Sequence, residues 1–242
     1  MNHIDVYRRN FLKRSTVAFA GLTIAPGIFL QTTQAKPVDD PVSNKNRWGL
    51  LIDTRKCADG CNDCVTACNT EHGLRSIHGE KTDAQWIRKV TLKNKSTGHQ
   101  ITMPMMCQHC ENPPCVDVCP TGASFKREDG IVLVDKHICI GCRYCMMACP
   151  YKARSFIHEV LTDQLPHAPR GKGTVESCTL CMHKVDRGDG TTACVEACSH
   201  GAMTFGDLND PNSIISQDLK KHGGRQLRAE LGLNTGVRYQ GL

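Results

Sequence analysis

The residues of this chain best suited to chemistry are its cysteines, because all sixteen fall into four groups of four. Two to four residues separate neighbouring cysteines, except for one gap of twelve in the last group, and three residues precede the final cysteine of every group. Four thiolates at such spacing can hold a metal centre. The groups are Cys57, Cys61, Cys64 and Cys68; Cys107, Cys110, Cys115 and Cys119; Cys139, Cys142, Cys145 and Cys149; and Cys178, Cys181, Cys194 and Cys198.

The third group reproduces the bacterial ferredoxin run C-x2-C-x2-C-x3-C-P, since Pro150 follows Cys149. In that run three thiolates bind one iron–sulfur cluster, while the fourth binds the second cluster of a two-cluster unit. Four groups of this kind predict four [4Fe–4S] clusters as the cofactors. All sixteen cysteines are then expected to be ligands of iron.

Other uses of cysteine fit the spacing less well. Disulfide-rich exported domains are usually short, and a recurring three-residue final gap is not typical of them. Zinc ribbons use two separated C-x2-C pairs, and the fourth group by itself matches that pattern, so zinc stays open there. Redox catalysis by a C-x-x-C pair would not need four copies.

Composition agrees with a cofactor-filled interior. The chain has 242 residues, of which 40% are hydrophobic and only 5% aromatic, and cysteine supplies much of the hydrophobic share. That is little apolar material for an ordinary core, and bound clusters would replace part of it. The net charge is +6, without a basic stripe interleaved with aromatic residues, which argues against nucleic-acid binding. The basic surplus would offset part of the clusters' negative charge.

The first 35 residues have the pattern of an export signal. Basic residues from Arg8 to Arg14 precede an apolar run that Pro26 and Gly27 interrupt, and small residues before Ala35 offer a cleavage site. The run is too short to span a bilayer. The pair Arg8 and Arg9 resembles the twin-arginine motif, with Tyr7 where Ser or Thr is usual. That route carries folded cargo, so we expect clusters to be inserted first. An uncleaved anchor and a basic start of a cytosolic protein are the alternatives.

Internal repeats indicate the elements that position the cysteines. The runs "LLIDTRKC" and "VLVDKHIC" lead into the first and third groups, and Phe125, Phe156 and Phe205 follow the last three groups at similar spacing. Each unit is therefore predicted to read strand, cluster loop, short helix, strand. The sequence around Asp129 and Gly130 predicts a hairpin. Four units predict an α+β fold made of two ferredoxin-like domains with loop insertions and a C-terminal extension.

Segments outside the repeats carry weaker signals. Residues 69–100 form an insertion with an expected strand at 86–90, residues 161–174 are expected to be a loop, and residues 209–224 predict one short helix. His109, His183 and His200 lie beside cysteines, where we expect spacers or hydrogen-bond donors to sulfur. Lys184 is expected to be a solvated loop charge.

The cysteine pattern of residues 47–205 resembles the four-cluster, ferredoxin-type electron-transfer subunits of bacterial respiratory complexes. Those subunits are partners of NrfD-type membrane proteins and of molybdopterin oxidoreductases. The narrower features "NPPCVDVCPTGASFKREDGIVLVDKHICIGCRYCMMACPY", "FGDLNDPNS" and "GVRYQGL" are most similar to DsrO-type subunits, the periplasmic iron–sulfur subunits of sulfite-reductase-associated Dsr membrane complexes.

The resemblance implies that groups one and four form an outer unit, residues 47–104 with 173–205, and groups two and three an inner unit, residues 105–172. Residues 1–35 are then the signal and residues 206–242 a partner-docking extension. The implied ligand sets are Cys57, Cys61, Cys64 with Cys198; Cys178, Cys181, Cys194 with Cys68; Cys107, Cys110, Cys115 with Cys149; and Cys139, Cys142, Cys145 with Cys119. The unusual gaps after Cys57 and Cys181 leave the cluster type open in groups one and four.

The resemblance further implies a periplasmic subunit, attached peripherally to the inner membrane, that relays single electrons. Its expected partners are an integral NrfD-type quinone-reactive subunit and a cytochrome c or another redox subunit of the same complex, within sulfur metabolism. An alternative is the iron–sulfur subunit of an exported molybdopterin oxidoreductase, such as a polysulfide or tetrathionate reductase. An enzyme with one open cluster, or a structural metal protein, is a further possibility. We find no catalytic motif, so no catalytic residue is predicted.

Overall fold

The computed structural model describes residues 23–25, 28–29, 42–79 and 81–242. Contacts divide the chain into two units, Met1–Lys36 and Pro37–Leu242. In the first unit, β1 (Thr23–Ala25) pairs antiparallel with β2 (Ile28–Phe29). The predicted export signal lies outside the described residues apart from these two strands. All cysteines belong to the second unit.

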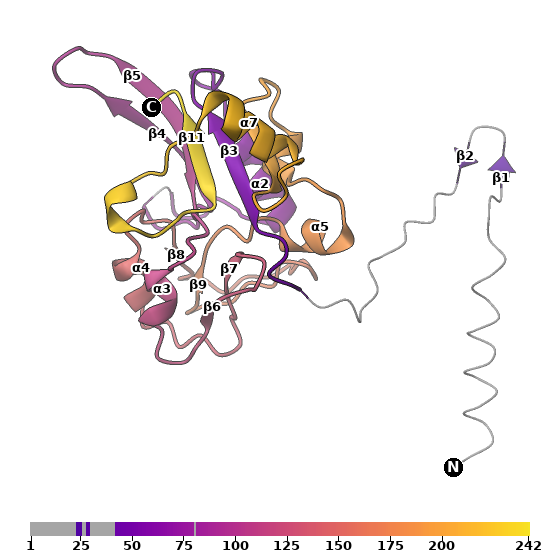
Figure 1. Ribbon diagram of the computed structural model, residues 1–242. Helices are drawn as coiled ribbons and strands as arrows, with labels where there is room; N and C mark the ends of the chain where they lie inside the picture. Colours follow the sequence, from indigo (N-terminus) through magenta and orange to yellow (C-terminus); the bar gives the residue numbers. More distant parts are fainter. Residues whose placement is uncertain (1–22, 26–27, 30–41, 80) are drawn as a thin grey trace. The chain divides into compact units, whose positions relative to one another are not determined.

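The central sheet of the second unit has three strands, with β3 in the middle (Figure 1). Strand β3 (Trp48–Asp53) pairs antiparallel with β10 (Met203–Asp207) and parallel with β11 (Val237–Gln240). Its run Leu50–Leu51–Ile52 is at most 3% exposed, which is typical of a strand covered on both faces. The strand predicted before the first cysteine group is therefore confirmed. It connects the beginning of the unit to its C-terminal part by pairing with β10 and β11.

A long hairpin occupies the insertion between the first two cysteine groups. Strand β4 (Ile87–Lys93) pairs antiparallel with β5 (Gln100–Met106), with Ile87 opposite Met106. The strand expected at 86–90 is confirmed, whereas its partner β5 was not predicted. Residues 91–100 at the hairpin's tip are all exposed, and the hairpin projects from the body in Figure 1.

Two short pairs of antiparallel strands flank the later cysteine groups. Strand β6 (Ser124–Lys126) pairs with β7 (Val132–Val134), and β8 (Ser155–Phe156) pairs with β9 (Val175–Glu176). The turn predicted at Asp129 and Gly130 is confirmed. Gly130 has a φ of +87°, which a glycine adopts without strain.

Short helices accompany the cysteine groups. Those associated with the cysteine groups are α2 (Asp63–His72), α3 (Pro114–Asp117), α4 (Tyr144–Ala148), α5 (Met182–Arg187) and α6 (Ala193–Glu196). Helix α2 packs against α6, and α3 packs against α4. The first cysteine group is thereby brought to the fourth and the second to the third, although they are far apart in the sequence.

The C-terminal segment belongs to the body of the second unit. Helix α7 (Ile214–His222), the predicted short helix, begins after Ser213, whose hydroxyl accepts a hydrogen bond from the amide of Ser216. A 3₁₀ turn, η1 (Ala229–Leu231), leads to β11, where Val237 and Tyr239 are fully buried. Docking of a partner by residues 206–242 stays a prediction.

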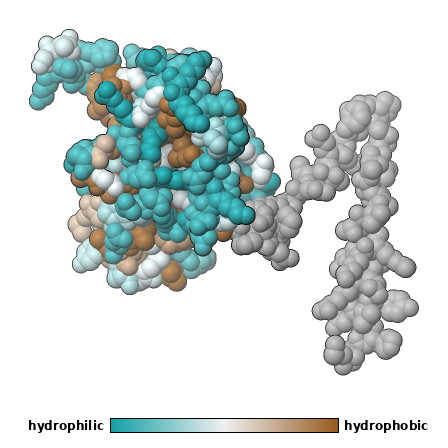
Figure 2. Space-filling model, viewed as in Figure 1, coloured by the Kyte–Doolittle hydropathy of each residue, from teal (hydrophilic) through white to brown (hydrophobic). Residues whose placement is uncertain are grey.

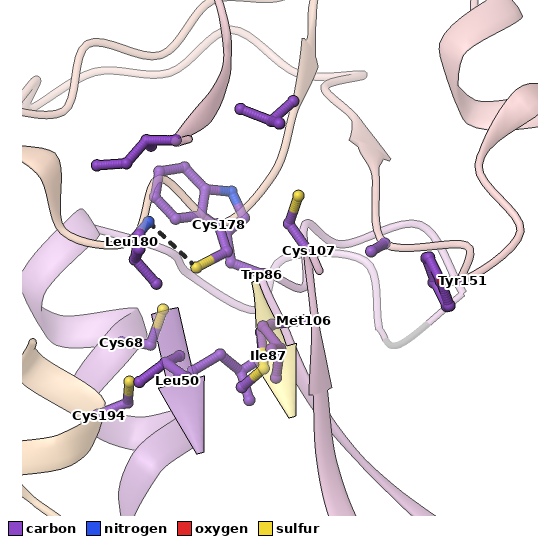
Figure 3. Packing of buried hydrophobic residues seen from close by; sticks show 14 of the residues in the cluster. Leu50, Cys68, Trp86, Ile87, Met106, Cys107, Tyr151, Cys178, Leu180 and Cys194 are labelled. Atoms are coloured by element: carbon purple, nitrogen blue, oxygen red, sulfur yellow. Dashed lines mark hydrogen bonds between the residues drawn. The ribbon is translucent and has the colours of Figure 1, made fainter. Parts of the chain in front are cut away.

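The core is rich in sulfur. Nine buried cysteines belong to the hydrophobic core cluster, beside Trp86, Ile87 and Met106, as Figure 3 shows for several of them. The thin apolar composition thus corresponds to an interior built partly from thiols. The elements are mixed and small, consistent with a ferredoxin-like α+β fold. No helix within the described residues is long and apolar enough to cross a membrane.

Candidate iron–sulfur sites

All sixteen thiols are free, and the extent of their burial differs among the four groups. Ten are buried and five are half-buried, whereas Cys142 of the third group is exposed. The third group therefore reaches closest to the surface. The thiols fall into neighbourhoods that combine residues from different groups.

The first neighbourhood joins the first group to the end of the fourth. Cys57, Cys61, Cys64 and Cys198 line one small cavity together with Lys89. Burial, with a smaller contribution from the nearby thiols of Cys57, Cys198 and Cys61, raises the pKa of the Cys64 thiol to about 11, although the Lys89 cation acts in the opposite direction. The packing of α2 on α6 brings the first cysteine group and the end of the fourth together.

The second neighbourhood joins the rest of the fourth group to the end of the first. Burial raises the pKa of Cys178 well above its ordinary value, with added repulsion from Cys68, Cys194 and Cys181. Figure 3 shows Cys68, Cys178 and Cys194 together beneath Trp86, with the amide of Leu180 donating to the sulfur of Cys178.

The second and third groups meet in the same crossed manner. Burial raises the pKa values of Cys107 and Cys110 to about 12, and both thiols have Cys115 and Cys149 as electrostatic neighbours. The remaining thiols, Cys119, Cys139, Cys142 and Cys145, lie on or beside the packed helices α3 and α4.

The electrostatics of these sites fit a metal centre. Burial disfavours a thiolate, so several of these cysteines ionise only when a cation compensates their charge. Iron bound by four thiolates provides that compensation and couples metal binding to folding. The donor set therefore suits iron–sulfur clusters.

Backbone amides near the cysteines donate to sulfur. The amide of Ser124 lies 3.3 Å from Sγ of Cys119, and that of Ala202 lies 3.2 Å from Sγ of Cys198. Burial alone would raise the pKa of Cys119, but this amide and the groups around Thr121 lower it overall. Such hydrogen bonds stabilise negative sulfur and set the reduction potential of a cluster.

Three cationic or polar side chains also reach the sulfurs. Nζ of Lys89 lies 2.7 Å from Sγ of Cys57, and Nη2 of Arg154 lies 3.1 Å from Sγ of Cys115. Nε2 of His72 lies 3.5 Å from Sγ of Cys181. None was predicted from the sequence. They are 32, 39 and 109 residues from their cysteines, so no local spacing marks them.

Of the histidines predicted beside the cysteines, His200 lines the cavity of the first neighbourhood, whereas His109 and His183 make other contacts. His109 accepts a hydrogen bond at Nδ1 from the amide of Val132 (3.1 Å), as a structural spacer would. Nε2 of His183 bonds the carboxylate of Glu71 at 2.7 Å. Lys184 is 9% exposed and pairs with Glu196, so the expectation of a solvated charge was wrong. Lys184 lies on a part of helix α5 that is buried in the unit.

The chain is similar to known iron–sulfur proteins. Residues 99–208 match the 4Fe-4S dicluster domain family. The chain is 40% identical to the Hdr-like menaquinol oxidoreductase iron–sulfur subunit 1 of Archaeoglobus fulgidus, covering 96% of this chain and 97% of that protein. It is 36% identical to a tetrathionate reductase subunit of Salmonella typhimurium, covering 99% and 90% respectively. It is 33% identical to the NrfC homologue of Haemophilus influenzae, covering 93% and 90%.

These relatives match the chain along nearly its whole length. Together with the clustered thiols they establish four [4Fe–4S] clusters as the cofactors. The chain belongs to the family of [4Fe–4S] electron-transfer subunits of quinone-linked and molybdoenzyme respiratory complexes.

Proposed function

We propose that this chain is a periplasmic subunit relaying single electrons between a membrane quinone-reactive NrfD-type protein and a second redox partner, such as a cytochrome c. The full-length similarity to a menaquinol oxidoreductase subunit is the observation that carries the quinone link. Bound [4Fe–4S] clusters supply one-electron transfer with little rearrangement. The chain's own residues hold the clusters, adjust their potentials and present them to partners.

We assign the ligands in four crossed sets: Cys57, Cys61, Cys64 with Cys198; Cys178, Cys181, Cys194 with Cys68; Cys107, Cys110, Cys115 with Cys149; and Cys139, Cys142, Cys145 with Cys119. The electrostatic neighbours of Cys64, Cys178 and Cys110 support the first three sets, since each neighbouring thiol belongs to the same set. The packing of α3 on α4 supports the fourth set. Two ferredoxin-like units, outer and inner, are the corresponding domain organisation.

The surface around Cys142 is the proposed electron-exchange face. Cys142 is exposed, and Ile140 and Met147, within five residues of it in the sequence, are each 66% exposed. Ile138 and Tyr144 extend the apolar surface. In Figure 2 hydrophobic residues also gather toward the end of the molecule that carries α3 and α4. An apolar rim around an exposed ligand would seat a partner while excluding water between the redox centres.

We further propose that the complex is of the Dsr type and acts in sulfur metabolism. The motifs "FGDLNDPNS" and "GVRYQGL" support this narrower assignment. Both segments belong to the central sheet region, at β10 and β11. The pair Arg8 and Arg9 supports export of the folded protein by the twin-arginine route.

A second candidate is the iron–sulfur subunit of an exported molybdopterin oxidoreductase. The similarity to the tetrathionate reductase subunit, over 99% of this chain, favours it. Both candidates require the same electron relay. They differ in the partner that the relay serves.

Copurification separates the two candidates. Native membranes would be solubilised with a mild detergent, the subunit captured through a C-terminal tag, and the attached proteins identified by mass spectrometry. We expect an integral membrane protein of the NrfD type with Dsr-complex subunits. A molybdopterin subunit would replace the Dsr assignment by the second candidate, and recovery of the subunit without any membrane protein would contradict both.

A further inference from the structure

Three histidines meet at one place outside the cysteine groups. His72 ends α2, His167 lies in the loop of residues 161–174, and His183 lies in α5. One ring nitrogen of each lies within 4.8 Å of one ring nitrogen of each of the others. The rings of His167 and His183 are 4.2 Å apart between centroids, and those of His72 and His183 are 5.5 Å apart. Imidazoles in this proximity can share a metal ion.

Each ring has an acceptor at Nε2. Nε2 of His183 lies 2.7 Å from Oε1 of Glu71, and Nε2 of His167 lies 2.8 Å from the backbone carbonyl oxygen of Glu71. Nε2 of His72 lies 3.5 Å from Sγ of Cys181. The His183 contact lowers the pKa of Glu71, which is therefore an ionised acceptor. For Cys181 the acceptor role rests on its proposed ligation of a cluster, which makes it a thiolate.

These acceptors determine the tautomers. A carboxylate, a carbonyl oxygen and a thiolate cannot donate, so each Nε2 must carry the hydrogen and each Nδ1 the lone pair. Nδ1 of His72 and Nδ1 of His183 are buried, and no group in the described part of the chain donates to either. A buried acceptor without a donor is costly. Metal-binding histidines show this arrangement, with the second nitrogen donating to a carboxylate or a carbonyl oxygen.

The surroundings hold the three rings in place. Trp86, which is 1% exposed, packs on His72 with 4.4 Å between ring centroids. Arg170 fixes the loop that carries His167, because it pairs with buried Glu176 and donates to the carbonyl oxygen of Gly73 at the end of α2. The side chain of His167 is 33% exposed, which leaves an approach from solvent.

We infer that His72, His167 and His183 form a binding site for one divalent transition-metal ion, separate from the four clusters. Three imidazoles suit zinc, copper, nickel or iron better than magnesium or calcium. The adjacent carboxylate of Glu71 compensates part of the ion's charge.

Zinc loading of the cluster-containing protein tests this site. The holoprotein would be incubated anaerobically with Zn²⁺, washed with a weak chelator, and assayed for zinc and iron by mass spectrometry. We expect about one zinc ion per chain beside about sixteen iron atoms. His167→Gln, which lies away from the cysteines, should lower the retained zinc about tenfold or more and leave the iron unchanged. His99→Gln, in the exposed hairpin, is the matched control and should retain zinc fully.

X-ray absorption at the zinc edge identifies the ligands without a variant. Imidazole nitrogens at about 2.0–2.1 Å are expected, whereas zinc in a cysteine site would show sulfur at about 2.3 Å. Zinc bound to sulfur, no zinc after the wash, or equal retention by His167→Gln would overturn the inference. A loss of iron would instead count against the cluster assignment, so the two failures are distinguishable.

Discussion

Arg154 donates from Nη2 to Sγ of Cys115 at 3.1 Å and from Nη1 to Oγ of Ser124 at 2.7 Å, while only 5% of the residue is exposed. Burial by itself would lower the pKa of this guanidinium, but the nearby sulfurs of Cys115, Cys107 and Cys145 raise it overall. A permanent positive charge is thus held between the second and third cysteine groups. It compensates negative charge that the buried sulfurs would otherwise carry unpaired.

Replacing Arg154 with Met should lower the reduction potential of one inner cluster. A nearby cation favours the more negative, reduced state, so its removal favours the oxidised state. We expect a fall of about 50 mV, corresponding to roughly 1 kcal/mol in a one-electron couple. Redox titration followed by EPR measures the shift. Arg187→Met, an exposed arginine paired with Asp189, is the control, and equal potentials in all three proteins would refute the role of Arg154.

Gly141 and Gly122 form a matched pair for testing the third cysteine group. Their φ angles are +68° and +69°, but a Cβ on Gly141 would lie 2.1 Å from the carbonyl oxygen of Gly173, whereas Gly122 has free space. Both Ala variants bear about 1–2 kcal/mol of backbone strain. Only Gly141→Ala adds a backbone clash, so we expect it to lose iron and to melt at a lower temperature than Gly122→Ala. Indistinguishable iron contents and melting temperatures would show that the Gly173 contact is unimportant.

Deleting residues 237–242 should destabilise the subunit itself. The deletion removes β11 from the central sheet, including Val237 and Tyr239, both fully buried. It also removes the Tyr239 hydroxyl that donates to the carbonyl oxygen of Pro104 in β5. Each buried side chain contributes about 1.5–3 kcal/mol, so we expect a lower melting temperature and less accumulated holoprotein. If the truncated chain kept its stability and lost only its partner, the segment would serve docking alone.

Introducing a charge into the apolar rim around Cys142 should weaken partner binding. Ile140→Glu and Met147→Glu place a carboxylate where an apolar contact would form, at positions that are each 66% exposed. We expect less membrane partner in copurification while all clusters are retained, because exposed substitutions rarely unfold a protein. Val160→Glu, 73% exposed and away from the cysteines in sequence, controls for added charge. Undiminished copurification with both rim variants would exclude this face.

The local part of the fold could be predicted from the residues themselves. The long-range part could not, apart from the pairing of cysteine groups that the family resemblance implied. Cysteine spacing, the apolar run of β3, the Asp129–Gly130 turn and helix α7 are all encoded within a few neighbouring residues. The parallel pairing of β11 with β3 joins residues almost two hundred positions apart, so no local sequence pattern predicts this pairing.

The same limit applies at the sites. The thiols were predicted from their spacing, whereas Lys89, Arg154 and His72 reach sulfur only after distant segments pack together. Lys184 shows the reverse error, because a charged residue beside a turn was expected in solvent. Its Glu196 partner, twelve residues away on α6, permits its burial.

Redox titration of the purified, anaerobic holoprotein, followed by EPR and combined with turnover assays, tests the central claim most directly. A relay built on four [4Fe–4S] clusters should give about four one-electron transitions and no turnover of sulfur compounds by the isolated protein. Sustained turnover without a partner, or clusters that do not undergo reversible reduction, would contradict an electron-relay subunit.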